Sequence, residues 1–469
     1  MEAFGQVRTW KRAFRLGISQ LLCLGRHTVT NLLCTAGRQG VDWSADYRLY
    51  SQDDWQVEGL FAVVLRQVAM RLPPGRPLVL AMDDTHLKKT GRHIPGAGYR
   101  RDPLSPAFAC NLIWAQRFLQ VSAALYDTLG PAAARCIPLA YEHAPSIPHP
   151  RKADPPEKWK EYRRQRKLKN LSTQGLERLR RLRQQMDAMP EAAGRRLLVT
   201  VDGSYTNKTV LRGLPPETTL IGRVRKDISL FAPAWSKSRR GELRRRYGSP
   251  LATPEQLRRD EAVAWHGVRA YAAGAVREFR VKTLSPVLWK KAGPQQVLQL
   301  MVVAPLGYRL RQNSRLLYRQ PAFLLCTDPQ LPEDELLQYY LWRWGVEVNH
   351  RDEKQIVGVG QAQVTNERSA WRQPALAVFS YALLLLAAAD TWGVAALDAT
   401  VPLPKWRSRH PGTMSTQQMV QQLRKEAWAY ALNDLAQSND DFVIGAAEAT
   451  KPSKLCDSLA SAVLLGSAA

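Results

Sequence analysis

The chain has 469 residues, 45% hydrophobic and 23% charged, which suffices for roughly two to four domains and excludes a broadly disordered protein. Lysine and arginine number 67 against 41 acidic residues, and the net charge of +26 points to a polyanionic partner. Nucleic acid fits better than an anionic membrane, because no basic amphipathic helix has a clean apolar side. The plain alternative is a set of solvated surface charges.

Other bulk features bear on the compartment. The six cysteines are scattered and form no C-x-x-C pair, which argues against a zinc site and against a disulfide framework. The N-terminal sequence lacks the apolar core of a signal peptide. The longest apolar run, residues 375–389, is too short to span a bilayer and predicts a buried helix. We therefore expect a cytoplasmic protein.

Residues 1–75 are expected to be helical. Residues 18–24, Gly25 and a possible N-cap at Thr28 before Val29–Thr35 form a short helix–turn–helix pattern. Taken alone, the pattern favours an ordinary helical hairpin. Residues 55–70 predict a further amphipathic helix.

After the Pro-Pro-Gly breaker at 73–75, residues 77–82 form a continuous apolar run that ends in Asp83 and Asp84. Such a run predicts a strand buried on both faces. Both faces are apolar, so alternation along the strand does not decide which acid faces a site. Residues 108–116 and 118–124 predict two further strands, paired as a hairpin.

Residues 151–183 are the most basic part of the chain, with 13 Lys/Arg against 4 Asp/Glu, a balance of +9. They predict one long helix with a cationic side that could follow a phosphate backbone, although charge runs are usually solvated faces. Residues 197–201 predict a second buried strand, which ends in Asp202. A helix near 207–212 and a strand at 219–225 follow, and this order indicates an α/β sheet.

Residues 227–330 predict a mostly β insertion that contains a basic loop at 237–248. An acid-rich first turn at 332–335 then starts a helix that leads into residues 340–354. Beyond the buried helix, residues 393–469 predict a basic loop at 405–409, a helix at 416–432 and a mobile tail.

One face of the expected helix carries Tyr340, Arg343, Glu347 and Lys354 within an arc of about 60°. Asp352 and Glu353 lie well off that face. Asp84, Asp202 and Glu347 are therefore the candidate acids, although a strand-terminal Asp alone is more often a turn residue. Carboxylates are the ligands that Mg²⁺ or Mn²⁺ prefers, and three of them can hold two ions for phosphoryl transfer. Without metal, such a cluster is expected to be strained or partly protonated.

The spacing Y-x2-R-x3-E-x6-K resembles the signature of a large group of bacterial insertion-sequence DDE transposases. In this resemblance Met-Asp-Asp84-Thr corresponds to the first acid, which favours Asp84 over Asp83, and Val-Thr-Val-Asp202-Gly corresponds to the second. The resemblance implies an RNase H-like core over residues 76–226 and 331–392, interrupted by the β-rich insertion. It implies that Tyr340, Arg343 and Lys354 hold DNA phosphates. Enzymes of this group place a tryptophan of the insertion against a flipped base, and the resemblance leaves Trp265 and Trp289 as undecided candidates. For both, a buried core position is favoured.

These features together predict a DDE transposase that uses two Mg²⁺ or Mn²⁺ ions, cuts transposon ends and joins the freed 3′-OH to target DNA. Its expected partners are double-stranded DNA (terminal inverted repeats and target) and a second copy of the chain, with no membrane, in a bacterial nucleoid-associated setting. Residues 1–75 are expected to bind DNA ends. The alternatives are an RNase H-like nuclease without strand transfer and a transposase-derived, non-catalytic DNA-binding protein.

Overall fold

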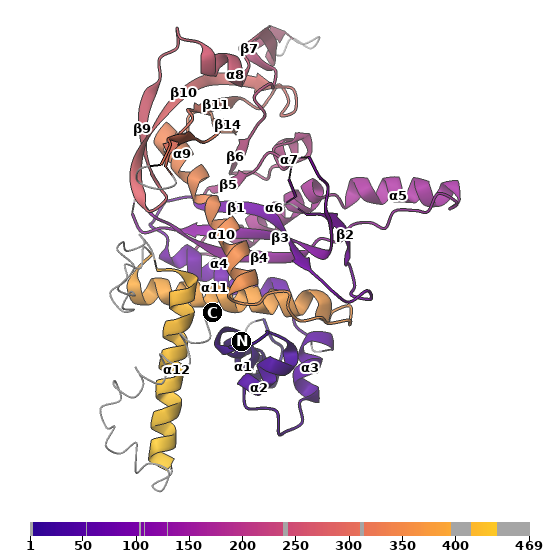
Figure 1. Ribbon diagram of the computed structural model, residues 1–469. Coiled ribbons are helices and arrows are strands. Elements are labelled where there is room, and N and C mark those ends of the chain that lie inside the picture. Colours follow the sequence, from indigo (N-terminus) through magenta and orange to yellow (C-terminus); the bar gives the residue numbers. More distant parts are fainter. Residues whose placement is uncertain are drawn as a thin grey trace. The chain divides into compact units, whose positions relative to one another are not determined.

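The computed structural model describes residues 3–52, 54–102, 105–106, 108–128, 130–237, 243–309, 314–394 and 414–438 (Figure 1). Contacts divide the chain into two units, each described here by itself. The helical unit comprises Met1–Leu60, Lys89–Pro95 and Arg351–Ala469, and the sheet unit comprises Phe61–Lys88 and Gly96–His350. The predicted division into 1–75, 76–226, 227–330, 331–392 and 393–469 does not follow these bounds and stays a prediction.

The sheet unit is mixed α/β and is built on one twelve-stranded sheet. The strands run in the order β2-β3-β1-β5-β6-β14-β11-β10-β7-β8, with β4 also beside β3 and β9 beside β10. Strands β1, β5 and β6 are mutually parallel, and the other pairs are antiparallel. The bounds are β1 Leu78–Lys88, β2 Gly98–Arg101, β3 Leu112–Leu125, β4 Arg135–His143, β5 Leu197–Val201, β6 Thr218–Arg223, β7 Leu230–Lys237, β8 Leu243–Pro250, β9 His266–Ala272, β10 Ala275–Trp289, β11 Leu298–Val303 and β14 Ala322–Cys326. A separate pair, β12 (Gly307–Tyr308) and β13 (Leu317–Tyr318), completes the strands.

Strand β1 does not end at the two acids, as the apolar run predicted. It continues to Lys88, because β3 pairs with it antiparallel over its whole second half, from Asp83↔Gln120 to Lys88↔Ala115. The two strands predicted at 108–124 are one strand, β3, whose polar middle residue Gln116 is fully buried. Its hairpin partner is β4, which the sequence did not predict.

The strands of the predicted insertion extend the same sheet. Strand β14 pairs with β6 antiparallel, and β11 and β10 follow in order. The predicted β content of residues 227–330 is confirmed, and strand pairing joins it to the strands that carry the acids. Part of the loop predicted at 237–248 forms β7 and β8, which pair antiparallel.

Two helices of the sheet unit begin at an asparagine cap. Asn170 caps α6 by accepting from the Thr173 backbone N–H, which divides the predicted single basic helix in two. Asn207 caps α7 in the same way. The bounds are α5 Pro156–Leu168, α6 Leu171–Asp187, α7 Lys208–Gly213, α8 Pro254–Arg259, α9 Glu333–Trp342 and α10 Trp344–Gln355, the last of which crosses into the helical unit. Helix α4 (Val57–Arg71) also crosses the boundary.

In the helical unit, α1 (Val7–Leu22) packs against α11 (Ser369–Trp392). Both of these helices also contact α3 (Ser44–Ser51) and α12 (Thr416–Ser438). Helix α2 (Val29–Thr35) begins at Thr28, whose side chain accepts from the Asn31 N–H, as the predicted cap requires. Gly17 allows the close approach of α1 to α11, because a Cβ there would lie 2.7 Å from Ser380 Oγ. The predicted loop at 405–409 and the tail lie outside the described residues.

Helix α11 covers the apolar run at 375–389. By length and composition it could cross a membrane, but 61% of its most apolar window is buried within the fold, and core helices pass the same test. Five cysteines lie in the described part of the chain and are free, whereas Cys456 lies outside it.

Candidate active site

The central parallel pair of strands brings two acids together. Leu78 to Met82 of β1 lie beside Leu197 to Val201 of β5, so the next positions of this register are Asp83 and Asp202. Adjacent positions of a parallel pair present their side chains to the same face. The register therefore predicts that Asp83 and Asp202, rather than Asp84 and Asp202, share a face.

Helix α10 packs on the face that Asp83 presents. Val346 forms a buried cluster with Ala81 and Cys136, and Ala81 is two residues before Asp83 on the same side of β1. The Asn349 amide donates to the Cys136 carbonyl at 2.9 Å, which fixes the helix against β4. Glu347, next to Val346, is thereby held on the same side of the sheet as Asp83.

Arg343 joins these acids. Its Nη2 donates to Glu347 Oε1 at 2.8 Å, and its side chain is 13% exposed. Burial lowers the pKa of Arg343, but the nearby Tyr340, Glu347 and Asp83 outweigh it, so the pKa lies above the ordinary value. The guanidinium thus shows that positive charge is accommodated among the carboxylates.

The predicted helix over 340–354 is divided at this residue. Helix α9 ends at Trp342 and α10 begins at Trp344, and the Arg343 N–H bonds to the Tyr340 carbonyl at 3.1 Å, one residue closer than in an α-helix. Tyr340 lies in the last turn of α9, and the Arg343 guanidinium lies over its ring, 5.6 Å from the centroid. Lys354 lies in the last turn of α10, in the part of that helix that belongs to the helical unit.

Asp84 lies on the opposite face. Tyr205 donates to Asp84 Oδ1 at 3.3 Å, and Tyr205 approaches Gly175 of α6, together with Met82. Burial raises the pKa of Asp84, and the negative charge of Asp202 adds to this shift. The positive charges of Arg117 and Arg100 and the hydrogen bond from Tyr205 act against it. The packing of α10 and the alternation of side chains along β1 favour Asp83 over the predicted Asp84 on the face that holds Glu347, while Asp202 acts electrostatically on both acids. The physical reason is that β1 continues past both acids, so alternation separates their side chains.

The surroundings of Asp83 disfavour its ionised form. Burial, together with the negative charges of Asp202 and Asp84, raises its pKa to about 7, although the Asp84 backbone N–H donates to its Oδ1 at 2.8 Å. This agrees with the expectation of partial protonation in the absence of metal.

Asp202 begins the turn that follows β5. Its Oδ1 accepts from the Ser204 N–H at 2.9 Å and from Ser204 Oγ at 2.6 Å, and its carbonyl accepts from Thr206 Oγ1 at 2.8 Å. These bonds define the conformation of residues 203–206. One carboxylate oxygen, Oδ2, takes no part in them.

The donor set suits a hard divalent cation, since Asp83, Asp202 and Glu347 offer only carboxylate oxygens and a cationic side chain already lies among them. Among the described residues, no three His, Cys, Asp or Glu side chains are gathered closely enough to hold a metal ion. Asp352, which the helical wheel excluded, is buried in the helical unit, where Thr416 Oγ1 donates to it at 2.7 Å.

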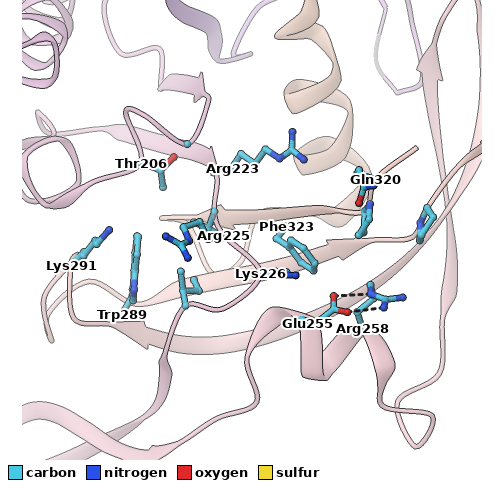
Figure 2. A pocket seen from close by; sticks show the side chains of 15 residues that line it. Thr206, Arg223, Arg225, Lys226, Glu255, Arg258, Trp289, Lys291, Gln320 and Phe323 are labelled. Atoms are coloured by element: carbon cyan, nitrogen blue, oxygen red, sulfur yellow. Dashed lines mark hydrogen bonds and ion pairs between the residues drawn. The ribbon is translucent and has the colours of Figure 1, made fainter. Parts of the chain in front are cut away.

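A cationic pocket of about 650 Å³ lies beside the Asp202 turn, and we call it the Trp289 pocket (Figure 2). Trp289 is 6% exposed, as the favoured core position predicted, and Lys291 Nζ lies 5.0 Å from its ring centroid. Trp265 does not line the pocket, and Lys282 Nζ lies 4.7 Å from its ring centroid. The lining residues are Gly203, Thr206, Arg223, Val224, Arg225, Lys226, Ile228, Glu255, Arg258, Trp289, Lys291, Pro305, Gln320, Pro321 and Phe323. The sequence analysis did not predict this pocket, because its residues come from distant segments.

Fold and site together define an α/β protein with carboxylates beside its central parallel strands and cations around them. Residues 4–291 match the family described as DDE superfamily endonuclease, and the chain belongs to this family. Membership implies a metal-dependent nuclease that acts on DNA. The match includes both candidate first acids and Asp202 but ends before the signature at 340–354. Comparison with curated proteins gives no match.

Proposed function

We propose that the protein is a DNA transposase that cleaves transposon ends and joins the 3′-OH to target DNA, with Asp83, Asp202 and Glu347 as its acidic triad. The observation that carries this proposal is the shared face of the sheet, where the register of β1 with β5 and the packing of α10 converge. We choose Asp83 rather than the predicted Asp84 because alternation along β1 turns the Asp83 side chain toward α10.

The strand order supports an RNase H-like core. Strands β4, β3 and β1 are antiparallel neighbours, and β5 and β6 continue from β1 in parallel. The helices α6, after β4, and α10, after the β-rich segment, lie on opposite faces of these strands. This arrangement gathers acids at the carboxyl ends of parallel strands, where α/β sheets form their sites.

The carboxylates of Asp83, Asp202 and Glu347 would hold two Mg²⁺ or Mn²⁺ ions, which supply activation of the attacking oxygen and stabilisation of the leaving oxygen. Arg343 is suited to bind a DNA phosphate by paired hydrogen bonds, and Tyr340 and Lys354 supply further donors. Among the proposed partners are terminal inverted repeats, target DNA and a second copy of the chain. The proposed setting is the bacterial cytoplasm, at the nucleoid.

A nuclease without strand transfer remains the second candidate, because family membership supports DNA cleavage and leaves the joining step open. A non-catalytic DNA-binding protein is less well supported, because the family to which the chain belongs is described as an endonuclease family.

The test is to incubate the purified full chain with its flanking inverted repeats, target plasmid and Mg²⁺. Transposase activity predicts cuts at the element ends and covalent joining, both abolished by Glu347→Ala, with end binding retained. Cuts without joined product would establish the nuclease. Cleavage that survives Glu347→Ala would overturn the triad.

A further inference from the structure

A second cationic pocket, which we call the Tyr205 pocket, lies on the Asp84 side of β1. Its volume is about 410 Å³. Tyr205 lines it and donates to Asp84 Oδ1, so the pocket belongs to the face of the sheet opposite Glu347. The lining residues are Arg117, Ser146, Ile147, Tyr162, Arg166, Lys169, Asn170, Leu171, Ser172, Ser204 and Tyr205. They include three cations and several hydroxyl and amide groups, and the described lining contains no acid.

The wall formed by the sheet is a fixed array of charge. Arg117 donates from Nε to the Ala144 carbonyl at 3.1 Å, which holds its guanidinium on the rigid strand β3. Behind it, Arg100 is 8% exposed and donates to Ser146 Oγ at 2.6 Å and to the Ala115 carbonyl at 3.2 Å. Asp84 acts electrostatically on both arginines.

The opposite wall comes from α5 and the junction with α6. Every residue of α5 is at least partly accessible, and Figure 1 shows this helix extending away from the sheet. Some of its cations are neutralised locally, as Arg164 is by Glu161 and Lys158 is by Asp154. Arg166 and Lys169, which line the pocket, form no ion pair with any described residue. Close to them, His149 stacks edge-on with Trp159 and Tyr162, with ring centroids 5.1 Å apart in each pair.

Such a helix is not explained by burial of apolar surface. An exposed cationic helix that keeps unpaired charges over an arginine-lined pocket is suited to a ligand that carries repeated negative charge. Hydroxyl and amide donors around the pocket match phosphate oxygens, which accept several hydrogen bonds at once. The pocket continues to the Asp202 turn, because Ser204 and Tyr205 line it while Gly203 and Thr206 of the same turn line the Trp289 pocket.

We propose that the Tyr205 pocket and the cationic side of α5 bind the phosphodiester backbone of duplex DNA at a position away from the cleaved bond. The inference rests on the proposed function, since it assigns a binding site to a stretch of the same DNA. Arg117, Arg166 and Lys169 contact phosphates, and Arg100 and Asp84 position Arg117.

The test measures the affinity of the full-length protein for a short labelled duplex of random sequence across a series of salt concentrations, with Ca²⁺ in place of Mg²⁺. The variant is Arg166→Ala with Lys169→Ala. The plot of log K against log salt has a negative slope, and loss of two phosphate contacts should make this slope shallower by about 2. The matched control is Arg269→Ala with Arg277→Ala, two exposed cations on β9 and β10, for which the slope should equal that of the wild type.

An unchanged slope in the Arg166/Lys169 variant, or an equal fall in the control, would overturn the inference. Arg166→Gln with Lys169→Gln keeps side-chain length, and it should give the same fall. Cleavage assays separate the two proposals. If the wild type leaves the inverted repeats uncut but the slope still falls, the pocket assignment stands and the proposed function fails. If cleavage depends on Glu347 and the slope is unchanged, only the pocket assignment fails.

Discussion

Asp83 and Asp84 are neighbours in the chain, and the sheet gives them different surroundings. The negative charge of Asp202 acts on both acids. Asp83 faces α10 and lies near Arg343, whereas Asp84 accepts from Tyr205 and lies near Arg117. Two acids that differ in this way are expected to differ in role, because only one can share ligands with Glu347.

We expect Asp83→Asn to lower Mg²⁺-dependent cleavage by about a thousandfold or more, because it removes one carboxylate of the proposed triad. Asp84→Asn should leave cleavage within about tenfold of wild type and act chiefly on DNA affinity. Rate measurements at saturating DNA separate the two effects. Equal loss of turnover in both variants would contradict the assignment.

The raised pKa of Asp83 gives a stability prediction for the metal-free protein. A carboxyl whose folded pKa is about 7, above its ordinary 3.8, binds protons more strongly in the folded state, so its contribution falls as pH rises from about 4 to 7. Asp83→Asn cannot ionise and should gain stability relative to wild type as pH rises through that window, by roughly 3 kcal/mol between pH 4 and 7. Thermal unfolding in EDTA measures this difference. A difference that does not change with pH would refute it.

At the scale of single elements, the approach of α10 to β4 positions Glu347. Gly345 makes this approach possible, because a Cβ there would lie 2.5 Å from Cys136 Cβ. Such a contact is too short for two carbon atoms, so a larger residue must displace the helix that carries Glu347.

Gly345→Ala should therefore destabilise the fold by about 1–3 kcal/mol and lower cleavage, despite the better helix propensity of alanine. Cys136→Gly in the same chain removes the clashing atom and should recover part of both losses, which a double-mutant cycle reports. Gly98→Ala is the control, because nothing lies within 4 Å of a Cβ there. Strictly additive effects of the Gly345 and Cys136 changes would show that the contact is not the cause.

Sequence patterns predicted elements well where one property dominates. The buried strand before Asp202, the N-cap Thr28 and the buried helix at 375–389 each follow from a local run or a capping residue. The choice between Asp83 and Asp84 depended on the length of β1, which is set by pairing with β3, and on the face that α10 covers. Strand length and helix packing are both set by tertiary contacts. A strand that is apolar on both faces has no sequence pattern that would reveal either of them.

At the scale of the whole sheet unit, the β-rich segment and the strands that bear the acids share one hydrogen-bonded sheet. Strand-like apolar runs in the sequence predicted the β content of this segment. They could not predict which strands of the sheet it pairs with, because strand order depends on pairing between distant residues. The pockets were missed for the same reason, since their walls combine segments far apart in the chain.

Replacing residues 227–330 with a short Gly/Ser linker should therefore yield an insoluble or aggregating chain. The deletion removes β14, the antiparallel partner of β6, and leaves that edge open to pairing with other chains. Soluble yield and size-exclusion chromatography measure the outcome, with the full chain as reference. A monomeric, cooperatively folded deletion variant would show that the segment is an independent domain.

The Arg343–Glu347 pair has a consequence for the order in which ligands assemble. Glu347 can pair with Arg343 or bind a metal cation, and Arg343 can pair with Glu347 or bind a phosphate. A ligand that takes one member of the pair leaves the other available, so DNA and divalent metal should each raise the affinity of the protein for the other by the same factor. Opening of the ion pair by DNA then frees Glu347 for metal, so that binding of the substrate helps to complete the site that acts on it.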